Sequence, residues 1–218
     1  MAEYIFEIKE LVNTALSELS EQHKSGKLVD APVANNHFLV RWITKSLKTQ
    51  RFSRSVFDDL SRWQKMGRSK GNDAAINFTF RKISQLYGEF FPQNEVKDVL
   101  DSQVESFLDA METLDWEVST SEPLTLGGKV QLFTESQNSL ALCSEQCDSC
   151  FDAETLVKPM SWFVRGNHQE FIEKAYQAGF LVHKVTDYKS AVKYHGEYLV
   201  FPANKGDRLA EIPFSIEC

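Results

Sequence analysis

The stretch Trp116-Glu117-Val118-Ser119-Thr120 marks a change in the pattern of this sequence. Before it, apolar side chains recur every three or four residues, as in amphipathic helices. From it onward they alternate with polar side chains, as in strands that bury one face. Alternating runs at residues 129–133 and 139–143 follow after short breaks, which predicts antiparallel neighbours. The change of period indicates an α+β protein.

The first half of the chain predicts an all-helical bundle. Ser53 can cap the third helix, where Phe52 and Phe57 are spaced as a hydrophobic staple. Ser102 and Glu105 form a capping box for the fifth helix. The five predicted helices cover residues 4–22, 35–47, 53–67, 73–91 and 102–114.

The second half predicts a mainly antiparallel sheet with one or two helices. Asn167 can cap a helix that Gly179 ends. Further strands are predicted at residues 180–185, 194–201 and 212–216. We therefore expect a helical half, residues 1–114, packed against an α+β half, residues 115–218, either as two parts or as one continuous module.

The composition is that of an ordered globular protein. The 218 residues are 42% hydrophobic and 25% charged. Neither a signal peptide nor an apolar run of membrane-spanning length is visible. We expect a cytoplasmic protein that does not enter a membrane. The sequence does not indicate its oligomeric state.

The net charge of −7 hides a basic island between residues 41 and 70. This island holds nine Lys/Arg and two Asp/Glu, a balance of +7, inside an otherwise acidic chain. Such local charge attracts anionic partners, and two helices joined by a short turn suggest helix-turn-helix-like contact with phosphates. Asp58 and Asp59 inside the second helix favour backbone contact over base recognition. The predicted nucleic-acid-binding residues are Arg41, Lys45, Lys48, Arg51, Arg54 and Arg62. The alternative is a solvated helical face partnered by acids from elsewhere.

Three of the four cysteines, Cys143, Cys147 and Cys150, lie within eight residues. In a reducing cytosol this clustering indicates metal or redox chemistry more than a disulfide framework. A zinc site would need a fourth ligand, for which the candidates are Cys218, His168, His183 and His195. A redox pair, or buried thiols without chemistry, are the alternatives.

His183 and His195 would face each other if their strands formed a hairpin centred near Lys189. They could then complete the metal site with the cysteines. The alternative is two unrelated strand histidines, because the register is assumed.

Several segments together resemble one uncharacterised bacterial family, the domain of unknown function 2913. They are Asn35-Asn36-His37-Phe38, Arg41-Trp42, Glu122-Pro123-Leu124, the cysteine segment, and the run from Lys158 to His168. The resemblance covers nearly the whole chain. It implies a bacterial cytoplasmic protein and supplies no activity, cofactor or catalytic residue.

No nucleotide-binding loop, nucleophile elbow or zinc-protease motif is present. The leading hypothesis is a non-enzymatic accessory or regulatory protein that contacts nucleic acid through the basic helices and carries a structural zinc site. One alternative is a metal or redox enzyme centred on the cysteines. The other is a module that binds a protein partner.

Overall fold

The computed structural model describes residues 3–125 and 127–216. The chain divides into two compact units, residues 1–94 with 216–218 and residues 95–215. We call them the helical unit and the sheet unit. The predicted boundary at residue 114 lies later than this division. The reason is that the fifth helix buries Phe107 against Trp162 of the sheet unit, so it belongs to that unit.

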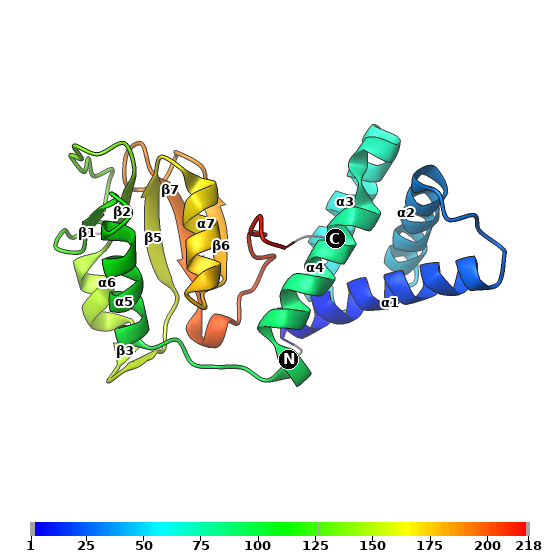
Figure 1. Ribbon diagram of the computed structural model, residues 1–218, viewed down its shortest axis with the longest axis horizontal. Helices are drawn as coiled ribbons and strands as arrows, with labels where there is room; N and C mark the ends of the chain where they lie inside the picture. The colour runs from blue at the N-terminus through cyan, green and yellow to red at the C-terminus, as the bar shows by residue number, and fades with distance from the viewer. Residues whose placement is uncertain (1–2, 126, 217–218) are drawn as a thin grey trace. The chain divides into compact units, whose positions relative to one another are not determined.

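The helical unit confirms the predicted all-helical pattern of residues 4–90 (Figure 1). Ser53 caps the first turn after the α2–α3 connection by accepting a bond from the Ser55 amide. The elements of this unit are α1 (Tyr4–Lys24), α2 (Pro32–Lys48), η1 (Arg54–Val56), α3 (Phe57–Lys70), η2 (Gly71–Ala74), α4 (Ile76–Phe90) and η3 (Pro92–Asn94).

The core of the helical unit is built from the apolar stripes of these helices. Trp63 of α3 meets Phe80 of α4 edge to face, with ring centroids 4.8 Å apart. Gly67 lets α3 approach Val40 of α2 and Ile76 of α4, because a Cβ at this position would overlap Val40. The close packing here depends on a residue without a side chain.

The sheet unit contains a five-stranded sheet in the order β1-β2-β5-β7-β6 and a separate β3–β4 pair. Its elements are α5 (Asp101–Glu112), β1 (Glu117–Ser119), β2 (Ser139–Leu142), α6 (Ser144–Ser149), β3 (Phe151–Asp152), β4 (Thr155–Leu156), β5 (Met160–Arg165), α7 (His168–Gln177), β6 (Val182–Thr186), β7 (Gly196–Val200) and η4 (Pro202–Asn204). The prediction of an α+β protein with a mainly antiparallel sheet is confirmed, since β1–β2 is the one parallel pairing of the described sheet.

Two predicted strands do not form. Residues 129–133 form no strand and make only an isolated bridge between Val130 and Val192. Because that middle strand is absent, β1 joins β2 through a long connection and pairs with it in parallel. Residues 212–216 also form no strand. A strand forms only where another segment pairs with it, and the edge strands of the described sheet, β1 and β6, pair with β2 and β7 and with neither of these runs.

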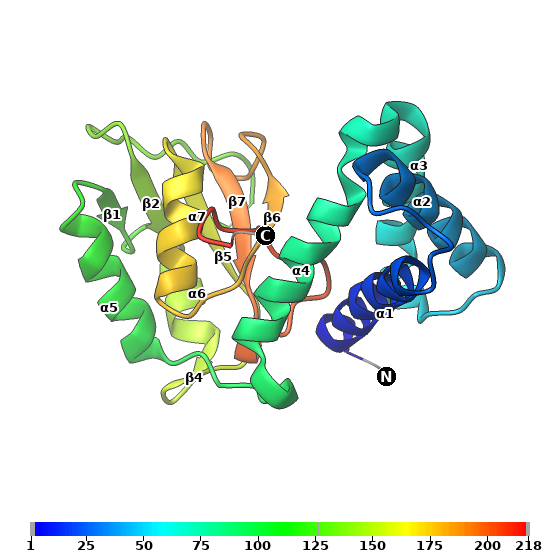
Figure 2. The ribbon, with the colours of Figure 1, turned by 45° about the vertical axis from the view of Figure 1, so that its right-hand side comes forward.

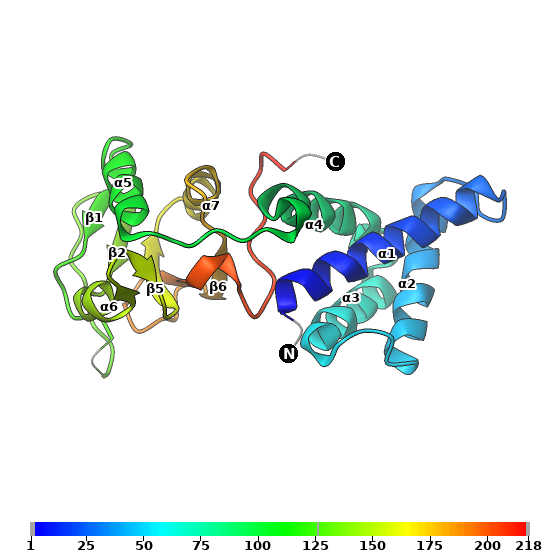
Figure 3. The same cartoon turned by 90° about the horizontal axis from the view of Figure 1, so that it is seen from below.

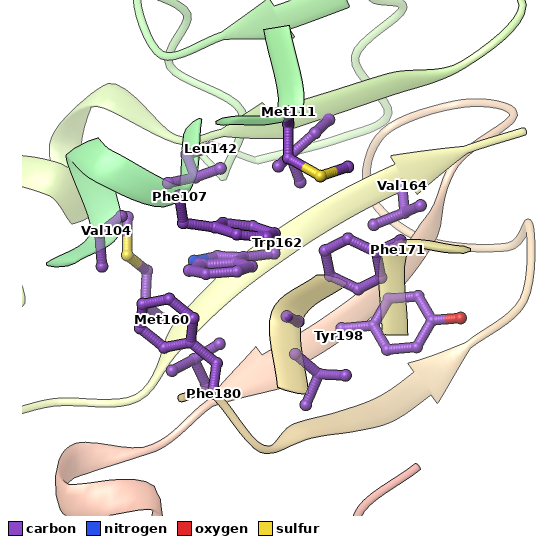
Figure 4. Packing of buried hydrophobic residues seen from close by; sticks show 14 of the residues in the cluster. Val104, Phe107, Met111, Leu142, Met160, Trp162, Val164, Phe171, Phe180 and Tyr198 are labelled. Carbon is purple, nitrogen blue, oxygen red and sulfur yellow. The ribbon is translucent and has the colours of Figure 1, made fainter. Parts of the chain in front are cut away.

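Helices α5 and α7 cover the same face of the sheet (Figures 2 and 3). Trp162 of β5 is at the centre of this core (Figure 4). Phe107 of α5 stacks on it at 5.2 Å, and Phe171 of α7 and Phe180 meet it edge-on at 6.1 and 5.1 Å. Aromatic packing of this kind holds both helices on the sheet.

The opposite face carries a second, smaller core to which the connecting segments contribute. Leu124 and Val192 pack there against Ala141 of β2 and Phe163 of β5. No described helix is both long enough and apolar enough to cross a membrane.

Candidate functional site

Helix α2 carries the main part of the predicted basic site. Arg41, Lys45 and Lys48 lie at positions i, i+4 and i+7, so they share one side of the helix, and all three are exposed. Arg54, at the start of η1, is exposed as well. Within residues 3–125 and 127–216, none of these four cations has a carboxylate partner.

A pocket of about 340 Å³ lies beside this cationic side, between α1 and α2. Three cations, Arg41, Lys45 and Arg51, and the aromatic residues Phe38 and Trp42 line it. The residues around it are Glu18, Gln22, Phe38, Arg41, Trp42, Lys45, Ser46, Thr49 and Arg51. An anion that enters the pocket therefore meets Arg41 and Lys45 on one wall.

The single carboxylate of this lining, Glu18, is already engaged. Its Oε1 pairs with Arg51 at 2.6 Å, and its Oε2 accepts a hydrogen bond from the Trp42 indole at 2.8 Å. The Arg51 guanidinium also lies over the Trp42 and Phe52 rings, 5.4 and 5.5 Å from their centroids. Glu18 therefore neutralises Arg51, and the positive charge of Arg41 and Lys45 remains.

Arg62 has a structural position. Its Nη2 lies 2.6 Å from Oδ1 of Asp59, whose Oδ2 accepts a 2.6 Å hydrogen bond from the Tyr4 hydroxyl. Burial raises the pKa of Asp59, and the bonds from Tyr4 and Arg62 act against that rise. Of the six predicted cations, Arg51 and Arg62 are thus paired inside the unit.

The α2–α3 pair does not have the crossed arrangement of a helix-turn-helix. The Asn36 amide donates to the Gly71 carbonyl at 2.6 Å, whereas Thr44, further along α2, accepts from Gln64, which precedes Gly71. Contacts in this reversed order mean that the two helices run antiparallel, while helix-turn-helix motifs cross at about 90–120°. The predicted helix-turn-helix-like geometry was therefore wrong.

The cysteine segment contains a short helix, α6, with Cys143 before it and Cys150 after it. Cys143 follows β2, and its thiol donates to the Glu145 carboxylate at 2.9 Å on the sheet face that holds Phe163. Cys147 and Cys150 pack instead into the core under α5 and α7. Cys143 continues the alternation of β2 and shares the face of Ala141, whereas α6 carries the other two cysteines to the opposite face.

No three His, Cys, Asp or Glu side chains among the described residues are grouped so that they could hold a metal ion. Cys218, a predicted candidate ligand, lies outside those residues. The zinc site therefore stays a prediction without a geometric basis here.

The two cysteines in the core are also poorly suited to redox chemistry. Burial, with a smaller contribution from Asp101, raises the pKa of Cys147 to about 11. Burial also raises the pKa of Cys150. Reactive cysteines need a lowered pKa, because the thiolate is the nucleophile.

His183 and His195 are not opposite each other. In the β6–β7 pairing His183 faces Leu199, and His195 precedes β7. The predicted hairpin was centred too early, since the connection is folded on itself by the Ser190 hydroxyl, which donates to the His195 carbonyl at 2.9 Å. His168, another candidate ligand, places its Nδ1 2.7 Å from the Tyr198 hydroxyl.

His195 is bonded to Ser139, a contact that the sequence did not predict. Its Nδ1–H points to the Lys193 carbonyl at 2.8 Å, so its Nε2 accepts from the Ser139 hydroxyl at 2.9 Å. Activated serines have this geometry. However, Ser139 and His195 are 0% and 1% exposed, so a substrate has no access to the pair and its role is structural.

Sequence reasoning missed the contribution of Glu18 and Trp42 to the basic pocket. The helical pattern placed Glu18 on the polar side of α1 and Trp42 in the core of α2. Their 2.8 Å hydrogen bond joins two helices, and no local spacing signals it.

A family model described as "Protein of unknown function (DUF2913)" matches residues 3–213 of the chain. No curated protein and no solved structure matches it.

Proposed function

The chain belongs to the DUF2913 family of proteins of unknown function, and we propose that it is an accessory or regulatory protein whose helical unit contacts the phosphate backbone of nucleic acid. The observation that carries this proposal is the set of four exposed cations, Arg41, Lys45, Lys48 and Arg54, that have no carboxylate partner in the described chain.

The charge distribution supports an anionic partner. The whole chain carries seven more acidic than basic side chains, so carboxylates are abundant. On the α2 side, nevertheless, no described carboxylate pairs with the three cations, and the acid of the neighbouring pocket, Glu18, is bonded to Arg51 and Trp42. A local positive field of this kind attracts phosphate groups even on an acidic protein.

The same geometry supports contact with phosphates rather than with bases. Bases of single strands bind by stacking on exposed aromatic rings. Trp42 is only 6% exposed, and Arg51 lies over its ring and over that of Phe52. Arg41, Lys45 and Lys48 are exposed along one side of α2, where they can follow a charged backbone.

Fluorescence anisotropy with labelled single-stranded and duplex oligonucleotides tests the proposal. Four phosphate contacts predict that affinity for duplex DNA falls about 10²-fold between about 50 and 200 mM salt. Replacing Arg41, Lys45 and Lys48 together by Gln should weaken binding and reduce the slope of log affinity against log salt by about three.

The matched control replaces Lys97, Lys129 and Lys189 by Gln. These lysines are exposed, lie in the sheet unit and change the net charge by the same amount. The control should bind like the wild type. The proposal is wrong if the wild type does not bind at low salt, or if both triple variants lose affinity equally. In the latter case net charge, not the α2 side, would be responsible.

A further inference from the structure

The basic pocket between α1 and α2 has a buried floor and a charged rim. Of its lining residues, Ser46 and Trp42 are only 2% and 6% exposed, whereas Arg41 and Lys45 are exposed. The two buried residues therefore form the floor and the two cations stand at the rim. The volume of about 340 Å³ is at the lower end of the range of small-molecule sites, which fits the end of a chain molecule better than a duplex.

Ser46 brings a hydroxyl without a partner to this floor. It lies one turn after Trp42 on α2, and its Oγ makes no hydrogen bond with a described residue. Unlike Asn36 Oδ1, which is unbonded and fully enclosed, the Ser46 Oγ keeps access to the pocket that Ser46 lines. Most buried side-chain polar atoms have a hydrogen-bond partner, so this hydroxyl points to a ligand that accepts from it.

The charges of the lining match a doubly charged anion. Glu18 is already bonded to Arg51 and to the Trp42 indole, and no described carboxylate pairs with Arg41 or Lys45. Three cations against one carboxylate leave the lining with a formal charge of +2. A phosphate monoester carries about −1.5 to −2 charges at pH 7, whereas each diester of a nucleic-acid backbone carries about one.

The buried position of Ser46 distinguishes the end of a strand from its interior. A phosphate diester has ester bonds on two sides, so its chain must continue past the rim in both directions, where Arg41 and Lys45 meet it first. A terminal monoester has one ester bond and enters end-on. Its three other oxygens then accept from three donors, which are the Ser46 hydroxyl, the Arg41 guanidinium and the Lys45 ammonium.

We propose that this pocket binds the terminal phosphate monoester of a nucleic-acid strand. Ser46 donates to the phosphate at the floor, and Arg41 and Lys45 hold it at the rim. This assignment rests on the proposed function, because it places a strand end on the same side of α2. Lys48 and Arg54 do not line the pocket and remain for the diesters that follow. A 5′-phosphate and a 3′-phosphate share this chemistry, and the experiment compares both.

Isothermal titration calorimetry of the full chain with a trinucleotide tests the pocket without a long backbone. The trinucleotide is used with a 5′-phosphate, with a 3′-phosphate and with two hydroxyl ends. At least one phosphorylated form should bind about tenfold or more tightly than the hydroxyl form, because the monoester adds charge-assisted hydrogen bonds.

Ser46→Ala should weaken binding of the phosphorylated trinucleotide about tenfold, because it removes the donor at the floor. The midpoint of thermal unfolding should stay that of the wild type, since the lost hydroxyl has no partner in the described chain. The matched control, Ser106→Ala, removes an exposed hydroxyl that donates to a carbonyl of its own helix, α5, and should leave the affinity unchanged.

Circular single-stranded DNA separates this proposal from the contact with the backbone, because it has no ends. The proposal is overturned if no phosphorylated trinucleotide binds, if the hydroxyl form or inorganic phosphate binds equally well, or if Ser46→Ala keeps full affinity. Binding of circular DNA at low salt would in those cases leave the backbone contact intact. Binding of a phosphorylated trinucleotide without binding of circular DNA would support the terminal site and contradict the backbone contact.

Discussion

The stability of the sheet unit should depend on the protonation of His183. Its side chain is fully buried, with the ring of Phe201 on one side and Gly206 so close that a Cβ would overlap the imidazole. Burial lowers the pKa of His183 from 6.5 to about 4, and the nearby backbone of Arg208 and Leu209 only partly offsets this. At 1.36 kcal/mol for each pKa unit, the difference corresponds to about 3 kcal/mol.

The sign of the effect follows from proton binding. Between about pH 6.5 and pH 4 the unfolded chain binds a proton at residue 183 and the folded chain does not. The free energy of unfolding should therefore carry the full contribution of His183 above pH 6.5 and lose it progressively as the pH falls to 4. Burial lowers the pKa of His168 and His195 as well, so they add to the loss in the same direction.

Urea unfolding at a series of pH values, followed by the methyl NMR signals of Val182 and Val200, measures this dependence. His183→Gln removes the titrating group, so its unfolding free energy should fall about 3 kcal/mol less than that of the wild type over this interval. His37→Gln, at an exposed position of α2, should follow the wild type. Parallel curves for His183→Gln and the wild type would refute the reasoning. So would an NMR titration of the wild type in which His183 has a pKa near 6.5.

Three further outcomes follow from the buried contacts. Ser139→Ala should destabilise the sheet unit by about 1–3 kcal/mol, because it leaves Nε2 of buried His195 without its partner. Ser121→Ala, at an exposed position, should have little effect. Urea unfolding compares the two variants, and equal stabilities of the two would contradict the Ser139–His195 bond. Phe107→Ala should lower the free energy of unfolding by about 3–5 kcal/mol, because the ring stacks on Trp162 in the core. Thermal unfolding, followed by Trp fluorescence, measures this loss. A loss below about 1 kcal/mol would mean that α5 does not pack against Trp162. Alkylation of Cys147 by iodoacetamide in the folded protein at pH 7.5, followed by mass spectrometry, should be about 10²-fold slower than that of a free cysteine, because a pKa near 11 leaves little thiolate. A rate equal to that of a free cysteine would show that the half-buried position of this thiol does not raise its pKa.

Local patterns in the sequence were sufficient to predict most helices, but they located few of the first residues: α2 begins at Pro32 rather than residue 35, and α4 at Ile76 rather than residue 73. The spacing of Ile5, Ile8 and Val12 indicated the buried side of α1, and all three residues are buried. Asn167 was expected to cap a helix, and its side chain accepts the Glu170 amide at the start of α7. Capping and amphipathic spacing act within one or two turns, so a single stretch of chain contains the information.

Strand pairing was less predictable. Residues 129–133 alternate as well as β1 does, yet only the latter finds a partner, in β2. A strand exists only if another segment offers its hydrogen-bonding groups, and that segment can be distant in sequence. The order β1-β2-β5-β7-β6 depends on such distant pairings.

The sequence by itself determined the fold class, the helical first half and the row of cations on α2, because each depends on the spacing of nearby residues. Only the tertiary structure decided which of the six predicted cations lack a carboxylate partner among the described residues, since Glu18 and Asp59 pair with Arg51 and Arg62. It also placed Cys143 on one face of the sheet and Cys147 and Cys150 on the other. Ion pairs and packing contacts form between segments that the fold brings together, and the spacing of residues along the chain does not specify them.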